Sequence, residues 1–322
     1  MTKNATLATA FSKEVHEGLT AYPKYLSSKY FYDAAGDKLF QKIMGLPEYY
    51  LTGKEYDILN ENSKAIVEQF SSKTGFDLIE LGAGDGKKTK LLLAELQQQQ
   101  KSFKYKPIDI SPHVLRELEA SVKKDWPEIE VHIQEGSYFE VLKDIDRSSD
   151  RKKVILFLGS NIGNLPHEKA VAFLKEIRKS MSAEDLLLAG FDKKKNPKLI
   201  LNAYNDSQGV TQDFNLNILR RINRELQADF DLDQFMHWPT YDPETGTAKS
   251  YLVSTQEQDV HLDALGLDIH FEAFESINTE ISQKYDDATV EWLAKESGLC
   301  ITEAYSDGDG HFTNYIFKNS NL

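Results

Sequence analysis

The feature of this sequence that most constrains its fold is an alternation of short apolar segments with longer amphipathic ones. It runs from residue 76 to residue 192, and the apolar segments read FDLIEL, FKYKPID, EVHIQEGSY, KKVILFLGS and DLLLAGFD. Short apolar strands separated by helices are typical of a parallel sheet with right-handed crossovers. We therefore predict a doubly wound, Rossmann-like α/β domain over residues 57–197.

The rest of the chain lacks this alternation. Residues 1–56 have helical spacing on either side of Pro47, and after Pro197 a helix precedes segments with the period-two pattern of antiparallel strands. The elements predicted there are a helix over 211–228, strands within 247–262 and 267–282, a helix capped by Asp287, and a hairpin that turns at 308–310.

These elements predict two discontinuous domains. The last helix and hairpin can complete the parallel sheet, so residues 286–322 are expected to join residues 57–197. Residues 1–56 and 198–285 are then expected to form a second, α+β domain that binds the substrate and acts as a lid.

The composition narrows the class of ligand. The 322 residues include 38 Lys and Arg against 51 Asp and Glu, a formal net charge of −13, so a nucleic acid or an anionic membrane would approach against the overall field. A small molecule is the expected partner. The single cysteine, Cys300, excludes an internal disulfide and suits a reducing compartment. We expect a cytoplasmic monomer, because neither an apolar run of membrane-spanning length nor coiled-coil heptads are found.

A glycine-rich segment, ELGAGDGKKT, follows the first predicted strand and opens the next helix. Gly82 and Gly84 let the backbone approach a ligand, and the helix amino terminus with Lys88 favours an anionic group such as a carboxylate. A dinucleotide site would have G-x-G-x-x-G, but Lys87 stands at the third glycine position. The G-x-G-x-G spacing is instead typical of loops that hold S-adenosylmethionine.

Polar residues at the ends of the next two predicted strands extend this site. Asp109 ends the second strand, where a carboxylate can accept both ribose hydroxyls of a nucleoside. Ser137 and Tyr138 end the third strand, where the adenine ring is expected. The loop, the acid and these two residues together predict a cofactor site.

Five longer strings make the chain resemble a known family, the histidine-specific Nα-methyltransferases of ergothioneine biosynthesis. The strings are FYDAAGDKLFQKIMGLPEYY, LIELGAGDGKKTKLLL, FLGSNIGNL, AYNDSQGVTQDFNLNILRRINRELQADFDLD and TEISQKY. The similarity covers residues 15–318. It implies a class I methyltransferase sheet and S-adenosylmethionine as the methyl donor, with methylation of the α-amino nitrogen of histidine, up to the trimethyl betaine (hercynine).

The same resemblance implies roles for individual residues. The contacts to the methyl donor fall on Tyr49, Gly82, Lys88, Asp109, Ser137 and Tyr138, and the loop's own pattern adds Gly84. The contacts to the amino-acid substrate fall on Tyr32, Asn164, Tyr204, Ser250, Glu280 and Ser282. Two positions depart from the family pattern, because Ser137 replaces an expected Asp and Ser250 replaces a Met of the mycobacterial members.

Taken with the resemblance, the strand pattern suggests how a histidine side chain is recognised. Glu280 and Ser282 are two apart on a predicted strand, so they share a face and can bond the two imidazole nitrogens. A buried acceptor left without a partner costs about 1 to 3 kcal/mol, so a side chain lacking the N–H is expected to be rejected.

The group that takes the proton from the amine is left open, and no metal is predicted. Methyl transfer needs an uncharged amine, and Tyr32, a water molecule and bulk solvent are all candidates for taking the proton. We expect the donor's sulfonium charge to lower the pKa of the amine. The eight histidines show no metal-ligating spacing, so no metal is predicted.

Histidine methylation has three alternatives. Fungal methyltransferases that act on tryptophan-derived or other aromatic amines share the fold, and Ser250 leaves that question open. A non-catalytic S-adenosylmethionine sensor is compatible with Ser137. A nicotinamide oxidoreductase is disfavoured by Lys87.

Overall fold

The alternating segments form one sheet in the computed structural model, which describes residues 9–72, 74–136 and 151–320. The chain divides into two units, which we call the sheet unit (Leu51–Lys194 and Gln283–Leu322) and the insertion unit (Met1–Tyr50 and Lys195–Ser282). The predicted breaks lay after residues 56, 197 and 285. The assignment of donor and substrate to the two units stays a prediction.

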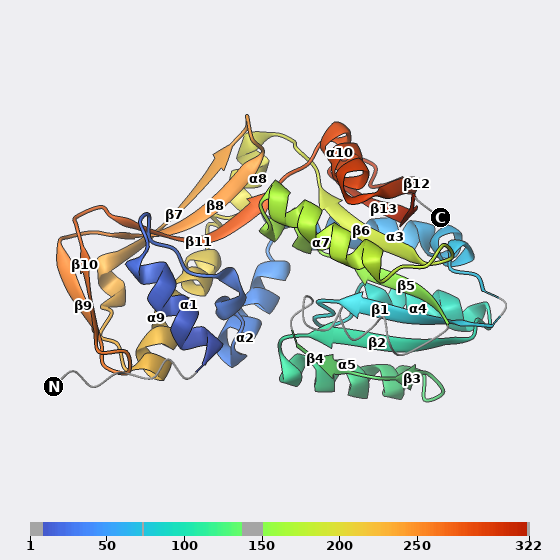
Figure 1. Cartoon of the computed structure of the whole chain (residues 1–322), viewed down its shortest axis with the longest axis horizontal. Helices are drawn as coiled ribbons and strands as arrows, with labels where there is room; N and C mark the ends of the chain where they lie inside the picture. The colour runs from blue at the N-terminus through green and yellow to red at the C-terminus, as the bar shows by residue number, and fades with distance from the viewer. Residues whose placement is uncertain (1–8, 73, 137–150, 321–322) are drawn as a thin grey trace. The chain divides into compact units, whose positions relative to one another are not determined.

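The sheet unit contains an eight-stranded sheet with the order β12-β13-β6-β5-β1-β2-β3, in which β4 also pairs with β2 (Figure 1). The pairs from β6 to β3 are parallel, and β13 runs antiparallel to β6. The strands are β1 (Phe76–Leu81), β2 (Phe103–Asp109), β3 (Glu130–Val131), β4 (Gln134–Glu135), β5 (Lys152–Phe157), β6 (Leu186–Asp192), β12 (Leu299–Ser306) and β13 (Phe312–Asn319). The predicted Rossmann-like sheet, completed by the last hairpin, is confirmed.

Helices cover both faces of this sheet, and each face has its own apolar core. One core includes residues of α7 and α10, and the other includes residues of α3, α4 and α5. The helices are α3 (Tyr50–Gln69), α4 (Thr89–Gln98), α5 (Pro112–Asp125), α7 (His167–Lys179) and α10 (Asp287–Ser297). Because parallel strands end at one edge of the sheet, the loops after β1, β2 and β5 share that edge.

The insertion unit combines helices with antiparallel strands, as predicted. Its two sheets have the orders β11-β8-β7 and β10-β9. The helices are α1 (Ala10–Thr20), η1 (Ser28–Phe31), α2 (Ala34–Met44), α8 (Pro197–Ala203), α9 (Val210–Leu226) and η3 (Leu232–Gln234). The strands are β7 (Phe235–Asp242), β8 (Thr247–Ser254), β9 (Gln258–Leu262), β10 (Leu267–Phe271) and β11 (Ser276–Gln283). They enclose an apolar core of their own.

Several local predictions need correction. The N-cap of α10 is Asp286, whose side chain accepts the Thr289 N–H at 2.8 Å, and Asp287 is already helical. Within the described residues, the third strand is split into β3 and β4. Both β7 and α8 were missed by the sequence reasoning.

No helix within the described ranges is both long enough and apolar enough to cross a membrane.

Candidate functional site

The glycine loop joins β1 to α4 in the sheet unit. Gly82, Gly84 and Gly86 have φ of 72°, 55° and 65°, a region that residues with a side chain rarely adopt. A Cβ on Gly86 would lie 2.2 Å from Leu118 Cδ1 of α5, whereas a Cβ on Gly84 would meet no described atom within 4 Å. Gly86 therefore allows the loop to pack on α5, and Gly84 presents its backbone to open space.

Asp109 ends β2, as predicted, and its carboxylate holds the glycine loop. Its Oδ2 accepts the Gly84 N–H at 3.0 Å, and its Oδ1 accepts the Ser111 N–H at 3.0 Å. Burial raises the pKa of the Asp109 carboxyl, although these two backbone hydrogen bonds lower it. Each carboxylate oxygen has a second lone pair, so the group keeps the capacity to accept ligand hydroxyls.

Lys88, at the start of α4, forms an ion pair that the sequence reasoning missed. Its Nζ lies 2.5 Å from Oε2 of Glu55, a residue of α3 whose side chain is fully buried. The sequence did carry a signal, because Glu55 follows Leu51 by four residues and precedes Ile58 and Leu59, which are buried on the same stripe of the helix. A carboxylate in an apolar stripe indicates a buried polar partner.

A second acid lies at the base of the glycine loop. Glu80 of β1 is buried and accepts hydrogen bonds from the hydroxyls of Thr89, the first residue of α4, and Tyr105 of β2. Burial raises the pKa of Glu80 to about 7, although both hydrogen bonds lower it. Glu80 thereby links β1, β2 and α4 where the loop leaves the sheet.

Asn164 lies in a short turn after β5 and not on the strand itself. Strand β5 ends at Phe157, and Asn164 is the exposed last residue of the short 3-10 helix η2 (Asn161–Asn164). Ser160 begins this turn with a φ of 55°, and its Oγ accepts the Asp192 N–H at 2.9 Å. The turn that carries Asn164 is therefore fixed to β6.

Ser137 and Tyr138 lie outside the described residues. Their predicted contact with adenine stays a prediction.

In the insertion unit, Tyr32 and Tyr49 both contact the ring of Phe40. The ring centroids lie 5.5 Å apart for Tyr32 and 6.2 Å apart for Tyr49, and Tyr32 also meets Phe214 of α9 at 5.6 Å. Two of the predicted tyrosines are thus joined by one aromatic cluster. Such edge-to-face contacts restrict the rings on which the predicted substrate and donor contacts depend.

The backbone beside Tyr32 is fixed by Asp33, the N-cap of α2. Its Oδ1 accepts the Gly36 N–H at 2.8 Å and an Asn217 Nδ2–H at 2.9 Å, while its Oδ2 lies 2.7 Å from Arg224 Nη2. Both Asn217 and Arg224 belong to α9. The position of Tyr32 is therefore set by contacts between α2 and α9.

Glu280 and Ser282 lie on β11, two residues apart as predicted, and Ser250 lies on the adjacent strand β8. Ser250 is fully buried, and its Oγ donates to Glu280 Oε2 at 3.1 Å. The Asn278 amide donates at 3.3 Å to the backbone oxygens of both Ser250 and Glu280. The structure thus brings Ser250 and Glu280 together and orients the carboxylate.

Tyr204 follows α8 and is buried. Its backbone oxygen accepts a hydrogen bond of 2.9 Å from Nε2 of His237 on β7. This acceptor places the proton of the neutral ring on Nε2, and burial lowers the pKa of His237. His237 therefore fixes the end of α8 as an uncharged donor, a role that no sequence pattern indicated.

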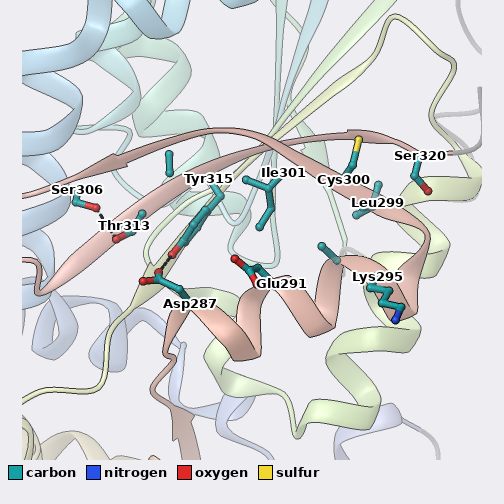
Figure 2. Close-up of a pocket in the computed structure, with 12 residues that line it drawn as sticks. Asp287, Glu291, Lys295, Leu299, Cys300, Ile301, Ser306, Thr313, Tyr315 and Ser320 are labelled. Atoms are coloured by element: carbon teal, nitrogen blue, oxygen red, sulfur yellow. Dashed lines mark hydrogen bonds between the residues drawn. The ribbon is translucent and has the colours of Figure 1, made fainter.

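Two further features lie outside the predicted site. A cavity of about 820 Å³ lies between α10 and the β12–β13 hairpin. Among its lining residues, Asp287 accepts a hydrogen bond of 2.5 Å from the Tyr315 hydroxyl (Figure 2). Its lining contains none of the predicted site residues.

The β12–β13 turn brings possible metal-ligating atoms of Asp307, Asp309 and His311 within 4.8 Å of one another. Asp307 accepts the His311 N–H at 2.8 Å, and Asp309 lies 2.5 Å from Lys54 Nζ. These local contacts account for the cluster, and the expectation that the protein needs no metal stays a prediction.

Comparison with known proteins places these features in a family context. The sequence profile of a family described as "Histidine-specific methyltransferase, SAM-dependent" matches residues 11–319. The histidine N-alpha-methyltransferase of Mycolicibacterium smegmatis is 37% identical over 95% of this chain and 94% of its own length. The protein of that name in Mycobacterium tuberculosis is 34% identical over 94% and 93%. Ergothioneine biosynthesis protein 1 of Schizosaccharomyces pombe is 28% identical over 90% of this chain and 38% of its own length.

Proposed function

The chain belongs to the family of S-adenosylmethionine-dependent, histidine-specific methyltransferases, and from that premise we propose that it methylates the α-amino nitrogen of L-histidine. The observation that carries the proposal is the family match over residues 11–319, which extends through both units. We further propose three successive transfers, to the trimethyl betaine, as the first step of ergothioneine biosynthesis. We also propose that the protein is cytoplasmic, because its single cysteine suits a reducing compartment. We propose that it is a monomer.

The groups of the sheet unit fit S-adenosylmethionine in their chemistry. Lys88 offers an ammonium for the carboxylate of the donor, and Asp109 offers a carboxylate for the ribose hydroxyls. The positive φ of Gly82 and Gly84 lets the loop backbone approach the donor. S-adenosylmethionine supplies a methyl group on a positively charged sulfur, which leaves the protein to align the amine with it and to exclude water.

In the insertion unit, we propose that Glu280 accepts an imidazole N–H of the substrate. Ser250 is buried and bonded to Glu280, so its proposed role is to hold that carboxylate and not to contact the ring of the substrate itself. Ser282 is the proposed partner of the other ring nitrogen. Tyr32, Tyr204 and Asn164 are proposed contacts to the amino-acid backbone of the substrate, and Tyr49 to the donor.

The test is a direct assay of product. The purified protein is incubated with S-adenosylmethionine and L-histidine, and the mono-, di- and trimethyl products are resolved by mass spectrometry beside a panel that includes tryptophan, tyrosine and phenylalanine. We expect methylated histidine with hercynine as the final product. Exclusive methylation of another amino acid, or binding of the donor without any transfer, would contradict the proposal.

A further inference from the structure

The buried carboxylate of Glu55 accepts hydrogen bonds from three segments of the sheet unit. These segments meet near the edge where the parallel strands end. Glu55 Oε2 accepts from Lys88 Nζ at 2.5 Å and from the Gly159 N–H at 2.7 Å, and Glu55 Oε1 accepts from Asn314 Nδ2 at 2.9 Å. Gly159 follows β5, and Asn314 belongs to β13. Glu55 is therefore a fully buried charge whose three donors come from distant segments.

The backbone leaves room for this carboxylate at one position. A Cβ on Gly190, two residues before the end of β6, would lie 2.3 Å from Glu55 Oε1 and 2.9 Å from the ring of Phe312. Glycine weakens a strand interior, and it is expected there where another group approaches the backbone closely. The glycine of the DLLLAGFD segment thus admits the side chain of Glu55.

A buried carboxylate is costly unless it is paired and hydrogen-bonded, so such an arrangement calls for a role. Among these three donors to Glu55, Lys88 carries a full charge, and its side chain is 22% exposed. A lysine without a partner extends its ammonium toward water. With one N–H directed to Glu55, the ammonium is held at the sheet edge and keeps two more donors for a ligand.

We propose that Glu55 is a positioning residue that holds the Lys88 ammonium in place for the carboxylate of the methyl donor. This inference rests on the proposed function, because it takes Lys88 as the contact for that carboxylate. Ordering a lysine side chain before the ligand arrives removes an entropy loss that otherwise weakens binding, an effect of about tenfold in Kd. Glu55 itself need not touch the donor.

The experiment measures Kd by calorimetry for two donors, S-adenosylmethionine and its decarboxylated analogue, which keeps the sulfonium and the nucleoside. The variants are Glu55→Gln, Lys88→Met, the double variant, and Glu61→Gln as a matched control at an exposed position of the same helix. We expect Glu55→Gln to weaken S-adenosylmethionine about tenfold or more and the decarboxylated analogue less than twofold. In the Lys88→Met background, Glu55→Gln should add nothing, and the control should match the parent.

Three results would overturn the proposal: equal weakening of both donors, additive losses in the double variant, or tighter binding of S-adenosylmethionine to Glu55→Gln. If Lys88→Met binds the donor normally, Lys88 does not contact the donor carboxylate and the proposal is wrong. The proposed function is tested separately, by histidine methylation with the unmodified protein. If Glu55→Gln does not fold, Gly190→Ala can be used instead, because it displaces the Glu55 carboxylate while both Glu55 and Lys88 keep their charges. The proposal then again predicts a larger rise in Kd for S-adenosylmethionine than for the decarboxylated analogue.

Discussion

The protonation of Glu80 links the stability of the sheet unit to pH near neutrality. The unfolded chain ionises this carboxyl near its ordinary pKa of 4.5, whereas burial raises the folded-state pKa to about 7. Between these values the folded state holds a proton that the unfolded state has released, so the free energy of unfolding falls as pH rises. The stabilising contribution is fully present below pH 4.5 and is lost as pH rises through 7.

The two pKa values set the size of the effect. A shift of one pKa unit corresponds to about 1.36 kcal/mol, so the difference between 4.5 and about 7 amounts to roughly 3 kcal/mol. Most of this change, about 2 to 3 kcal/mol, falls between pH 5 and pH 8. Glu80→Gln should remove it, because a glutamine resembles the protonated acid and can still bond the hydroxyls of Thr89 and Tyr105.

The assay is urea unfolding of the parent and of Glu80→Gln at pH 5, 6, 7 and 8, with the exposed Glu61→Gln as control. We expect the stability of Glu80→Gln relative to the parent to rise by about 2 to 3 kcal/mol from pH 5 to pH 8. The control variant should show no such trend. A difference between Glu80→Gln and the parent that stays constant with pH would refute the reasoning.

Four further outcomes are expected. Glu280→Ala should lower kcat/KM for histidine by roughly 10- to 100-fold, the value of a hydrogen bond to a charged group, and an unchanged rate in the mass-spectrometric assay would refute the imidazole contact. Asp109→Asn should raise the calorimetric Kd for S-adenosylmethionine by about tenfold or more, since the ribose hydroxyls would lose the charged acceptor that we propose for them. Lys284→Met should lower the free energy of unfolding, measured by chemical denaturation, by about 3 to 5 kcal/mol, because Asp192 stays buried without the ammonium that now lies 2.7 Å away. The double variant Lys284→Met with Asp192→Leu should regain most of this loss. Activity should survive dialysis against EDTA, and a loss restored by one divalent metal would show a missed site.

The sequence predicted the sheet well because the pattern of a buried parallel strand is local. The continuously apolar segments form β1, β5 and β6, whose residues are nearly all buried. The more polar third segment forms the two short strands β3 and β4 within the described residues. Strand β7 was missed because Pro239 interrupts its pattern. The structure places β7 at the edge of its sheet, where a missing N–H is tolerated.

The contacts that shape the candidate site are the part that the sequence could not supply. Glu55 is separated from its three partners by 33, 104 and 259 residues, and no periodicity encodes such a pairing. Ser250 and Glu280 are likewise 30 residues apart, on neighbouring strands. Local patterns predict which residues are buried, whereas the partner of a buried polar group depends on how the strands are ordered.

The partners of the acids at the sheet edge explain why Asp109 is suited to a cationic ligand. Glu55 is paired with Lys88, Asp192 is paired with Lys284, and Glu80 holds its proton up to a pKa of about 7. Asp109 differs from these three, because the N–H groups of Gly84 and Ser111 that donate to it are neutral. These bonds spread its charge without cancelling it, so the carboxylate keeps a negative potential beside the glycine loop. We therefore expect the sulfonium of the methyl donor to meet an attractive charge at Asp109, while the other acids hold the elements of this edge together.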